Sequence, residues 1–225
     1  LMFGLPGQDV EASLKDLCTA VSLKPAHISF YQLTVEPNTF FYSRPPILPN
    51  DDLIWEMQIG GQGFLASGSY TQYEVSAYAQ AGRHCEHNLN YWRFGDYLGI
   101  GAGAHSKLSC TTMHTIRRHW NRRQPRQYMD CARSGRAAEG QRILDADDAQ
   151  FEFMLNALRL TDGFALRLFA ERAGLPELML EPRLIELVQR ELLWRSNGRI
   201  GPTLLGRRFL DDVIGVFLTR DERDN

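Results

Sequence analysis

Residues 87–92 concentrate side chains that can bind a metal, form hydrogen bonds or stack. His87, Asn88, Tyr91 and Trp92 supply an imidazole, an amide, a phenol and an indole within six positions. The following stretch, 95–105, alternates glycine with small apolar residues, which is typical of a strand that a backbone or ligand approaches closely. Two interpretations are open. The stretch is either the wall of a site for a flat ligand, or a capped loop that leads into a tightly packed, buried strand.

Five arginines lie within ten positions, at the end of a strand that we predict over residues 111–120. Guanidinium groups bind carboxylates and phosphates through two parallel hydrogen bonds. Arginine is also common on solvated hairpin edges, where it opposes further strand pairing. An anion site and a solvated edge therefore remain alternatives. The five residues are Arg117, Arg118, Arg122, Arg123 and Arg126.

The cysteines form no recognisable metal motif. The four of them are Cys18, Cys85, Cys110 and Cys131. No two of these have CxxC spacing, so the chain carries no recognisable zinc or iron–sulfur motif of its own. Cys85 could join His84 and His87 in holding a metal, but the sequence offers no fourth ligand beside them.

The composition is that of an ordinary globular protein. The 225 residues are 44% hydrophobic and 23% charged, with a formal net charge of −2. Nothing in this balance points to nucleic acid or to an anionic membrane surface. No apolar run approaches the roughly 20 residues that span a bilayer, and there is no signal-peptide pattern. A cytoplasmic location is therefore expected.

The first 80 residues predict an α/β arrangement. A strand at Leu1–Phe3, a helix capped by Asp9 and a strand over 27–35 form one βαβ unit with neighbouring parallel strands. A proline-rich loop over 36–50 leads to a helix that Asp51 or Asp52 is expected to cap. This helix contains three glycines, each costing about 1 kcal/mol relative to alanine. A strand over 70–75 continues the alternation. Because the chain begins within a strand, we expect further sequence before Leu1.

After residue 145 the pattern becomes helical. Apolar residues at helical spacing over 151–158, 168–173 and 184–192 predict three helices. The first of these helices is expected to continue until Gly163 ends it. A brief strand over 199–202 precedes a last helix that Thr203 caps. This order is winged-helix-like and raises DNA binding as an alternative. Residues 151–218 contain nine Lys plus Arg and nine Asp plus Glu, which cancel, whereas DNA-reading modules are usually basic. A protein-packing or lid role is therefore favoured.

Several segments resemble a known family. The chain is similar to the oxygen-independent coproporphyrinogen III oxidase-like family of radical S-adenosylmethionine (SAM) proteins, and within it to the HemW branch of haem chaperones. The most specific motif is HNxxYW followed by GDYLGIGAGAH. The resemblance extends from end to end. The matching segments are residues 1–8, 28–37, 70–76, 87–105, 151–163 and 206–213.

The resemblance implies a fold and a division into three segments. The fold would consist of the last βα units of a partial radical-SAM (β/α) barrel, followed by a mainly helical, winged-helix-like C-terminal domain. The segments would be residues 1–80, a connecting region 81–143 with the HNxxYW motif and a hairpin, and a C-terminal domain 144–225. The CxxxCxxC motif that holds a [4Fe–4S] cluster in the family would lie upstream of Leu1.

The resemblance also implies cofactors, partners and a function. Haem would be bound by His87, Asn88, Tyr91 and Trp92, with its propionates near Arg93, Arg117 and Arg118. The SAM pocket would be bordered by Met2, Gly4, Tyr31 and Thr34. We expect a chaperone that passes haem or porphyrin to a receiving haem protein. The alternatives are an oxidase that decarboxylates porphyrinogen propionates, and an inactive fragment that only binds haem or protein. No nucleic acid partner and no integral membrane segment are expected.

Overall fold

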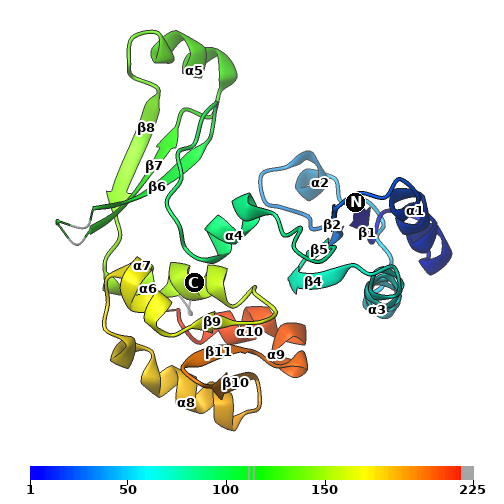
Figure 1. Ribbon diagram of the computed structural model, residues 1–225. Helices are drawn as coiled ribbons and strands as arrows, with labels where there is room; N and C mark the ends of the chain where they lie inside the picture. The colour runs from blue at the N-terminus through cyan, green and yellow to red at the C-terminus, as the bar shows by residue number, and fades with distance from the viewer. Residues whose placement is uncertain (111, 114, 219–225) are drawn as a thin grey trace. The chain divides into compact units, whose positions relative to one another are not determined.

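Figure 1 shows the computed structural model, which describes residues 1–110, 112–113 and 115–218. Contacts between residues divide the chain into two compact units, Leu1–Cys85 and Glu86–Asn225. The division into three segments that the resemblance implies, with boundaries after residues 80 and 143, stays a prediction. Among the described residues, no helix is both long and apolar enough to cross a membrane.

The first unit opens with the predicted βαβ arrangement. Strand β1 (Met2–Phe3) is followed by helix α1 (Val10–Ser22) and by strand β3 (Tyr31–Gln32), which pairs with β1 in parallel. The Asp9 side chain accepts a hydrogen bond from the Ala12 N–H at 2.8 Å. This bond satisfies one of the free donors in the first turn. Both the parallel pair and the helix cap confirm the sequence predictions.

The rest of this unit corrects the prediction of continued parallel alternation. The strand expected over 27–35 is interrupted at Phe30, so that β2 (His27–Ser29) belongs to a different sheet from β3. There it pairs antiparallel with β5 (Ala77–Ala79), which in turn pairs antiparallel with β4 (Thr71–Glu74). Only two residues separate β4 from β5. So short a connection permits a hairpin but no parallel crossover.

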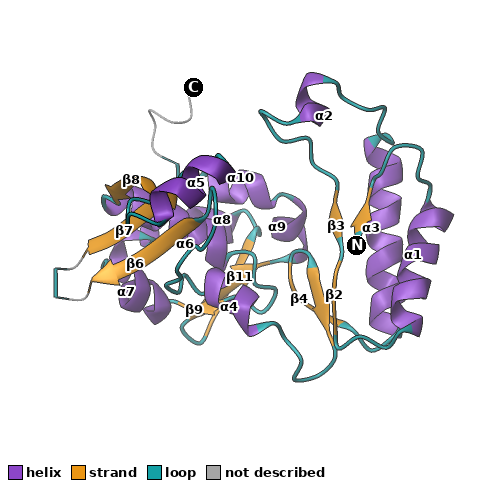
Figure 2. Cartoon of the chain, turned by 90° about the horizontal axis from the view of Figure 1, so that it is seen from above, coloured by secondary structure: helices purple, strands orange, loops and turns teal. Residues whose placement is uncertain are grey.

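Two helices follow the βαβ arrangement. The loop expected over 36–50 contains a short helix, α2 (Phe40–Ser43), which the sequence did not reveal. Helix α3 (Asp51–Ser67) is capped by Asn50 rather than by Asp51 or Asp52, since the Asn50 side chain accepts from the Leu53 N–H at 2.9 Å. Figure 2 shows α1 and α3 lying side by side against the strands. Their buried faces form a core that includes Phe3, Leu17, Phe30, Met57 and Leu65.

One glycine of α3 is required by this core. A Cβ atom at Gly61 would lie 2.5 Å from Cε1 of Phe30 and 3.2 Å from Cδ1 of Leu17. At Gly63, by contrast, a Cβ atom would meet nothing within 4 Å. The missing side chain at Gly61 therefore lowers helix propensity but allows α3 to approach the strands. Gly63 has no such packing role.

The second unit begins with helix α4 (Glu86–Trp92) and then forms an arm over residues 105–143. The arm consists of β6 (His105–Cys110), β7 (Thr115–Asn121) and β8 (Ala138–Ile143), all antiparallel, with helix α5 (Pro125–Ala132) at its tip (Figure 1). The strand predicted over 111–120 begins at Thr115, and its positions 111 and 114 lie outside the described residues. It pairs with β6 and not with the glycine-rich stretch.

The glycine-rich stretch is a loop, so the predicted buried strand is wrong. The side chains of Leu98 and Ile100 are 69% and 89% exposed. Gly101 and Gly103 have φ angles of +111° and +71°, which are incompatible with an extended strand. Before His105, where β6 begins, the described part of the stretch has a single β-bridge, between Tyr97 and Lys107.

The C-terminal part has the winged-helix-like order that the sequence predicts. The elements are α6 (Ala146–Ala157), β9 (Phe164–Ala165), α7 (Arg167–Ala173), the short 3₁₀ helix η1 (Glu177–Met179), α8 (Glu181–Gln189), β10 (Leu193–Ser196) and β11 (Arg199–Pro202). The three strands form one antiparallel sheet in the order β10-β11-β9. Helix α6 ends before the predicted Gly163.

The last predicted helix is divided in two. Thr203 caps its first part, α9 (Leu204–Arg208), by accepting from the Gly206 N–H at 3.0 Å, as expected. At Phe209 the backbone leaves the helical region, with φ −112° and ψ 39°, and α10 (Leu210–Gly215) follows. The break brings Val213 and Phe217 into the core, where both are fully buried.

The packing of α3 predicts opposite effects for two alanine substitutions. Gly61→Ala should destabilise the protein by about 1–3 kcal/mol, because Phe30 and Leu17 must move to admit the methyl group. Gly63→Ala should instead stabilise it by up to about 1 kcal/mol, through helix propensity alone. Urea unfolding of both variants measures the difference. Equal effects of the two substitutions would contradict the packing role of Gly61.

Candidate functional site

Helix α4 presents the imidazole of His87 to solvent. The ring packs edge-on against Tyr91 one turn later, with ring centres 4.8 Å apart and an angle of 83° between the rings. Within the described part of the chain, no hydrogen bond is made by the His87 ring. Asn88 is half-buried and engaged in an interaction of its own. The loop expected over these residues is instead the helix α4, and the spacing of one helical turn brings His87 and Tyr91 together.

A chain of contacts ties Tyr91 to the base of the arm and to α6. The Tyr91 and Tyr97 rings lie 4.5 Å apart, and the Tyr97 hydroxyl accepts a hydrogen bond from Arg118. Arg118 also donates through Nε to Glu152 of α6 at 2.8 Å. The same carboxylate accepts from Arg142 at 3.0 Å. These contacts fix the orientation of the Tyr91 ring while leaving the His87 ring accessible.

Trp92 is only partly available to a ligand. The guanidinium carbon of Arg159 lies 4.4 Å from the centre of the Trp92 ring, so one face of the indole is already covered. The indole Nε1 is buried and has no hydrogen-bond partner in the part of the chain that the structure describes. The Arg159 guanidinium therefore occupies one face on which the predicted stacking could take place.

The turn that follows α4 requires a glycine at position 95. Phe94 adopts a left-handed backbone with φ +54° and donates its N–H to the Tyr91 carbonyl at 2.8 Å. Asn90 donates from Nδ2 to the Asp96 carbonyl at 2.9 Å and accepts from the Gly95 N–H through its backbone oxygen at 2.7 Å. A Cβ atom at Gly95 would lie 2.0 Å from the Asn90 Oδ1. Glycine is therefore required there.

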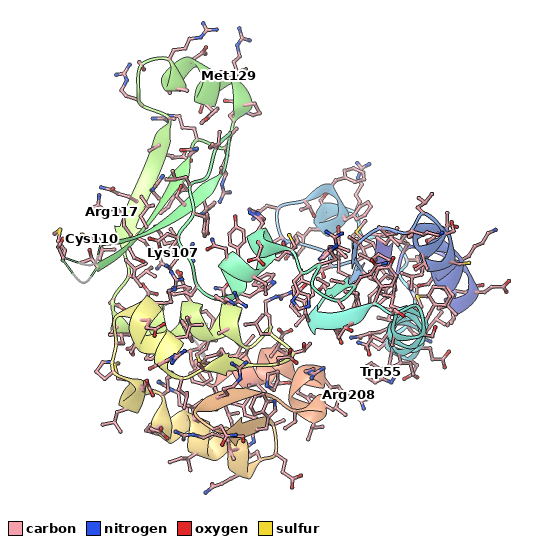
Figure 3. The ribbon with its side chains drawn as sticks, viewed as in Figure 1. Trp55, Lys107, Cys110, Arg117, Met129 and Arg208 are labelled. Atoms are coloured by element: carbon pink, nitrogen blue, oxygen red, sulfur yellow. The ribbon has the colours of Figure 1, made fainter. Side chains whose placement is uncertain are left out.

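Lys107 is a central residue that sequence reasoning missed. Its side chain is only 1% exposed, and Nζ donates to Asp96 Oδ1 at 2.9 Å, to the Phe94 carbonyl at 3.0 Å and to Ser109 Oγ at 3.2 Å. The ammonium also lies 4.1 Å from the centre of the Phe94 ring. Figure 3 shows Lys107 at the base of the arm. The signal available in the sequence was a lysine between a serine and a leucine just after the glycine-rich stretch.

Burial and pairing act in opposite directions on these two charges. Burial is the largest influence on Asp96 and would raise its pKa, but the hydrogen bonds from Ser109 and Lys107 together outweigh it and lower the pKa. For Lys107, burial dominates and lowers the pKa, although the Asp96 carboxylate partly compensates. The pair therefore holds a charged lysine in place at the expense of its hydration.

The glycine-rich loop is anchored at the opposite end by Asn121. This side chain donates from Nδ2 to the Gly101 carbonyl at 2.9 Å and to the Gly99 carbonyl at 3.3 Å. Ser106 Oγ accepts from the Gly99 N–H at 2.8 Å. The anchored loop leaves Leu98 and Ile100 as exposed apolar side chains after Tyr97, the residue that packs on Tyr91.

The structure does not gather the predicted arginines into one group. Arg93 is exposed directly after α4, whereas Arg118 is engaged with Glu152 and Tyr97 and is only 17% exposed. Arg117 faces the other side of β7 and lies beside Cys110 (Figure 3). The Thr112 hydroxyl chiefly, with Arg117 contributing, lowers the pKa of the Cys110 thiol.

In the first unit, the paired ends of β1 and β3 bring three of the four predicted SAM-pocket residues together. Met2 is the direct partner of Tyr31, and their side chains are 39% and 45% exposed. Gly4 follows with φ +71°, and an added Cβ atom would lie 3.6 Å from Ile54 Cγ1. Thr34 is exposed just beyond β3.

The described residues were also compared for side chains that could share a metal ion. No three His, Cys, Asp or Glu side chains among them are placed to hold a metal ion. His84 stacks on Tyr73 instead, with ring centres 4.5 Å apart.

Two matches to known proteins identify the fold. Residues 144–209 match the HemN C-terminal domain family model. The chain also superimposes on a solved structure described as coproporphyrinogen III oxidase (HemN) from Escherichia coli, a radical SAM enzyme, with a TM-score of 0.72 over 96% of this chain and 53% of that one. The sequence identity is 19%, so this likeness establishes the fold alone.

Curated relatives narrow the class. The chain is 44% identical to the heme chaperone HemW of Escherichia coli over 97% of its own length, 40% identical to that of Haemophilus influenzae over 98%, and 33% identical to that of Bacillus subtilis over 97%. It spans 56% of the length of the first two relatives. Over nearly its whole length the chain is thus similar to proteins named heme chaperone HemW, as its motifs indicated, and residues 144–209 match the HemN C-terminal domain.

Loss of the Asp96 carboxylate should be costly because it leaves the Lys107 ammonium buried. Asp96→Asn is expected to reduce the free energy of unfolding by about 3 kcal/mol, near the low end for breaking a buried pair because Asp96 itself is 40% exposed. The control is Glu171→Gln, which removes an exposed pair with Arg167 and should cost less than about 1 kcal/mol. Urea unfolding at neutral pH compares them, and similar losses would refute the role of Lys107.

The same pair predicts a specific acid sensitivity. The lowered pKa of Asp96 means that the unfolded chain binds a proton more readily than the folded one, so this contribution to stability is present above about pH 4 and is lost as pH falls through the lowered value. The Asp96→Asn variant should therefore lose less stability than the parent protein between about pH 5 and pH 2. Chemical unfolding across that range measures the difference. Parallel acid curves for the two proteins would contradict it.

Proposed function

We propose that this chain is the C-terminal portion of a haem chaperone and that it binds haem or porphyrin beside helix α4. The observation that carries the proposal is the exposed imidazole of His87, free of hydrogen bonds in the described structure and packed edge-on against Tyr91. The 44% identity to a protein named heme chaperone HemW supports it.

The surroundings of His87 suit an iron-bearing, flat and largely apolar ligand. Neutral imidazole is a common axial ligand of haem iron, and the phenol of Tyr91 is a second possible ligand in the same turn. The half-buried Trp92 and the exposed residues Leu98 and Ile100 would supply apolar contacts. Asn88 would help to orient the imidazole through a hydrogen bond. Bound haem would bring iron; the protein would hold and orient it.

The propionates of haem call for cationic partners. Arg93 is exposed immediately after α4 and is the best placed of the predicted arginines. Arg117 is exposed on β7, while the guanidinium of Arg118 is engaged by Glu152 and Tyr97. We therefore rank Arg93 before Arg117 as a propionate contact. For Arg118 we favour a positioning role through Tyr97 and Tyr91.

A role for SAM concerns the longer protein. The family implies SAM and a [4Fe–4S] cluster in its full-length members, and the cluster motif CxxxCxxC does not occur in this chain. Met2, Gly4, Tyr31 and Thr34 would border the SAM pocket from the ends of β1 and β3. The backbone of Gly4, with no side chain, leaves room for close approach at this edge. This border is part of the proposal.

The alternative functions lack a specific observation in their favour. Coproporphyrinogen III oxidase activity is named for a structural neighbour at 19% identity, which supports the fold only. An inactive fragment that binds haem or protein would share the α4 region. Measuring the transfer of haem to a receiving protein distinguishes a chaperone from such a fragment. The receiving haem protein and a cytoplasmic location stay predictions.

The proposal predicts that one histidine controls haem binding. His87→Ala should lower haem affinity at least about tenfold, or shift the Soret band of the complex, because the iron loses an axial ligand. The matched control is His105→Ala, another exposed histidine, which stacks on Trp120 at the base of the arm. Haem titration followed by absorbance measures both variants. Thermal unfolding should show only small changes, since both side chains are exposed.

Two outcomes would contradict the haem proposal. The first is that His87→Ala binds haem with unchanged affinity and spectrum. The second is that His87→Ala and His105→Ala weaken binding equally, which would indicate nonspecific adsorption of haem to exposed imidazoles.

A separate prediction concerns SAM in the full-length protein. Tyr31→Ala should weaken SAM binding several-fold, whereas Tyr42→Ala, which removes an exposed tyrosine from α2, should not. Tyr31 is a better test than Gly4, because the φ of +71° at Gly4 makes any side chain strain the backbone itself. Equilibrium dialysis with labelled SAM measures the affinity. Equal affinities for the two tyrosine variants would remove Tyr31 from the pocket.

A further inference from the structure

The arm carries positive charge in a chain that is slightly acidic. Residues 105–143 contain Lys107 and eight arginines but only two acidic residues, Asp130 and Glu139, which gives a formal charge of +7. The whole chain has a formal net charge of −2. The surface charge of the protein is therefore strongly segregated, and the arm is its basic part.

The arginines at the tip of the arm differ from those elsewhere in the second unit. Arg118, Arg142 and Arg195 form ion pairs with carboxylates. None of the five tip arginines forms an ion pair with any carboxylate that the structure describes. These five are Arg122, Arg123, Arg126, Arg133 and Arg136. Their charges are thus available to a partner.

Two of these arginines line a cavity. Its volume is about 430 Å³, and its lining consists of Arg122, Gln127, Asp130, Cys131 and Arg136. The Nε of Arg122 is buried and has no hydrogen-bond acceptor among the described residues. A buried donor without an acceptor costs free energy, and a carboxylate oxygen would satisfy it. With two guanidinium groups and one carboxylate, the lining keeps a net positive charge.

The side chains around the cavity favour a protein partner. All the basic residues of the tip are arginines, and Met129 of α5 is 56% exposed among them (Figure 3). Arginine and methionine are enriched at protein–protein interfaces, from which lysine is depleted. A lipid surface is usually met by lysine-containing segments with several large apolar anchors, and α5 offers only this methionine.

We propose that the tip of the arm is a docking surface for an acidic protein, one carboxylate of which enters the cavity beside Arg122 and Arg136. This surface goes beyond the haem site, and its binding requires no haem. The partner is recognised by clustered Asp and Glu side chains around an apolar contact for Met129. The bidentate geometry of arginine suits such carboxylates better than a single point charge would.

The cavity allows a matched test on the intact protein. The variant Arg122→Gln/Arg136→Gln removes the two arginines that line the cavity, and Arg123→Gln/Arg126→Gln removes the same charge from the same tip outside it. The probe is a short fluorescein-labelled peptide rich in Asp and Glu with one central leucine, and its Asn/Gln counterpart is the neutral control. Fluorescence anisotropy at low salt, without haem, gives the affinities. Circular dichroism verifies that both variants fold.

The cavity variant should bind the acidic peptide about tenfold or more weakly, and the matched variant only a few-fold more weakly, because exposed charge pairs are individually weak. The neutral peptide should not bind. Equal losses in the two variants, or no binding of the acidic peptide to the parent protein, would overturn the proposal. The proposal would also be overturned if the parent protein sedimented with phosphatidylserine vesicles and the cavity variant did not. The partner would then be a lipid surface.

Discussion

The second unit depends on the hydrogen bonds that surround the buried ammonium of Lys107. A charge that is almost completely removed from water is tolerated only when hydrogen-bonding partners surround it. Asp96, the Phe94 carbonyl and Ser109 provide these partners. Because they come from the turn after α4 and from β6, satisfying one charge fixes both segments. The left-handed backbone at Phe94 is held in place by the same contacts.

This support determines what α4 can do. Lys107 also pairs through its backbone with Tyr97, whose ring packs on Tyr91 and whose hydroxyl binds Arg118. Packing and hydrogen bonds thus fix the side chains of Tyr91 and Tyr97. The His87 ring, by contrast, is exposed and makes no hydrogen bond in the described structure. A rigid support beneath an accessible imidazole is the arrangement that ligand binding requires.

The arginines of the arm have two different roles, which their partners decide. At the base, Arg118 and Arg142 converge on Glu152 of α6 and connect the arm to the helical part of the unit. At the tip, Arg122 and Arg136 line an open cavity and have no carboxylate partner among the described residues. A cluster that looks uniform in sequence is therefore structural at one end and available for binding at the other.

The sequence by itself determined the local features. The helix caps at Asp9 and Thr203, the first βαβ unit, the winged-helix-like order and the family motif were all predicted, because neighbouring residues specify them. Only the tertiary structure decided the remainder. It divided the strand over 27–35 between two sheets, placed the glycine-rich stretch in a loop and buried Lys107. Strand pairing and charge burial depend on partners distant in sequence, which no local pattern specifies.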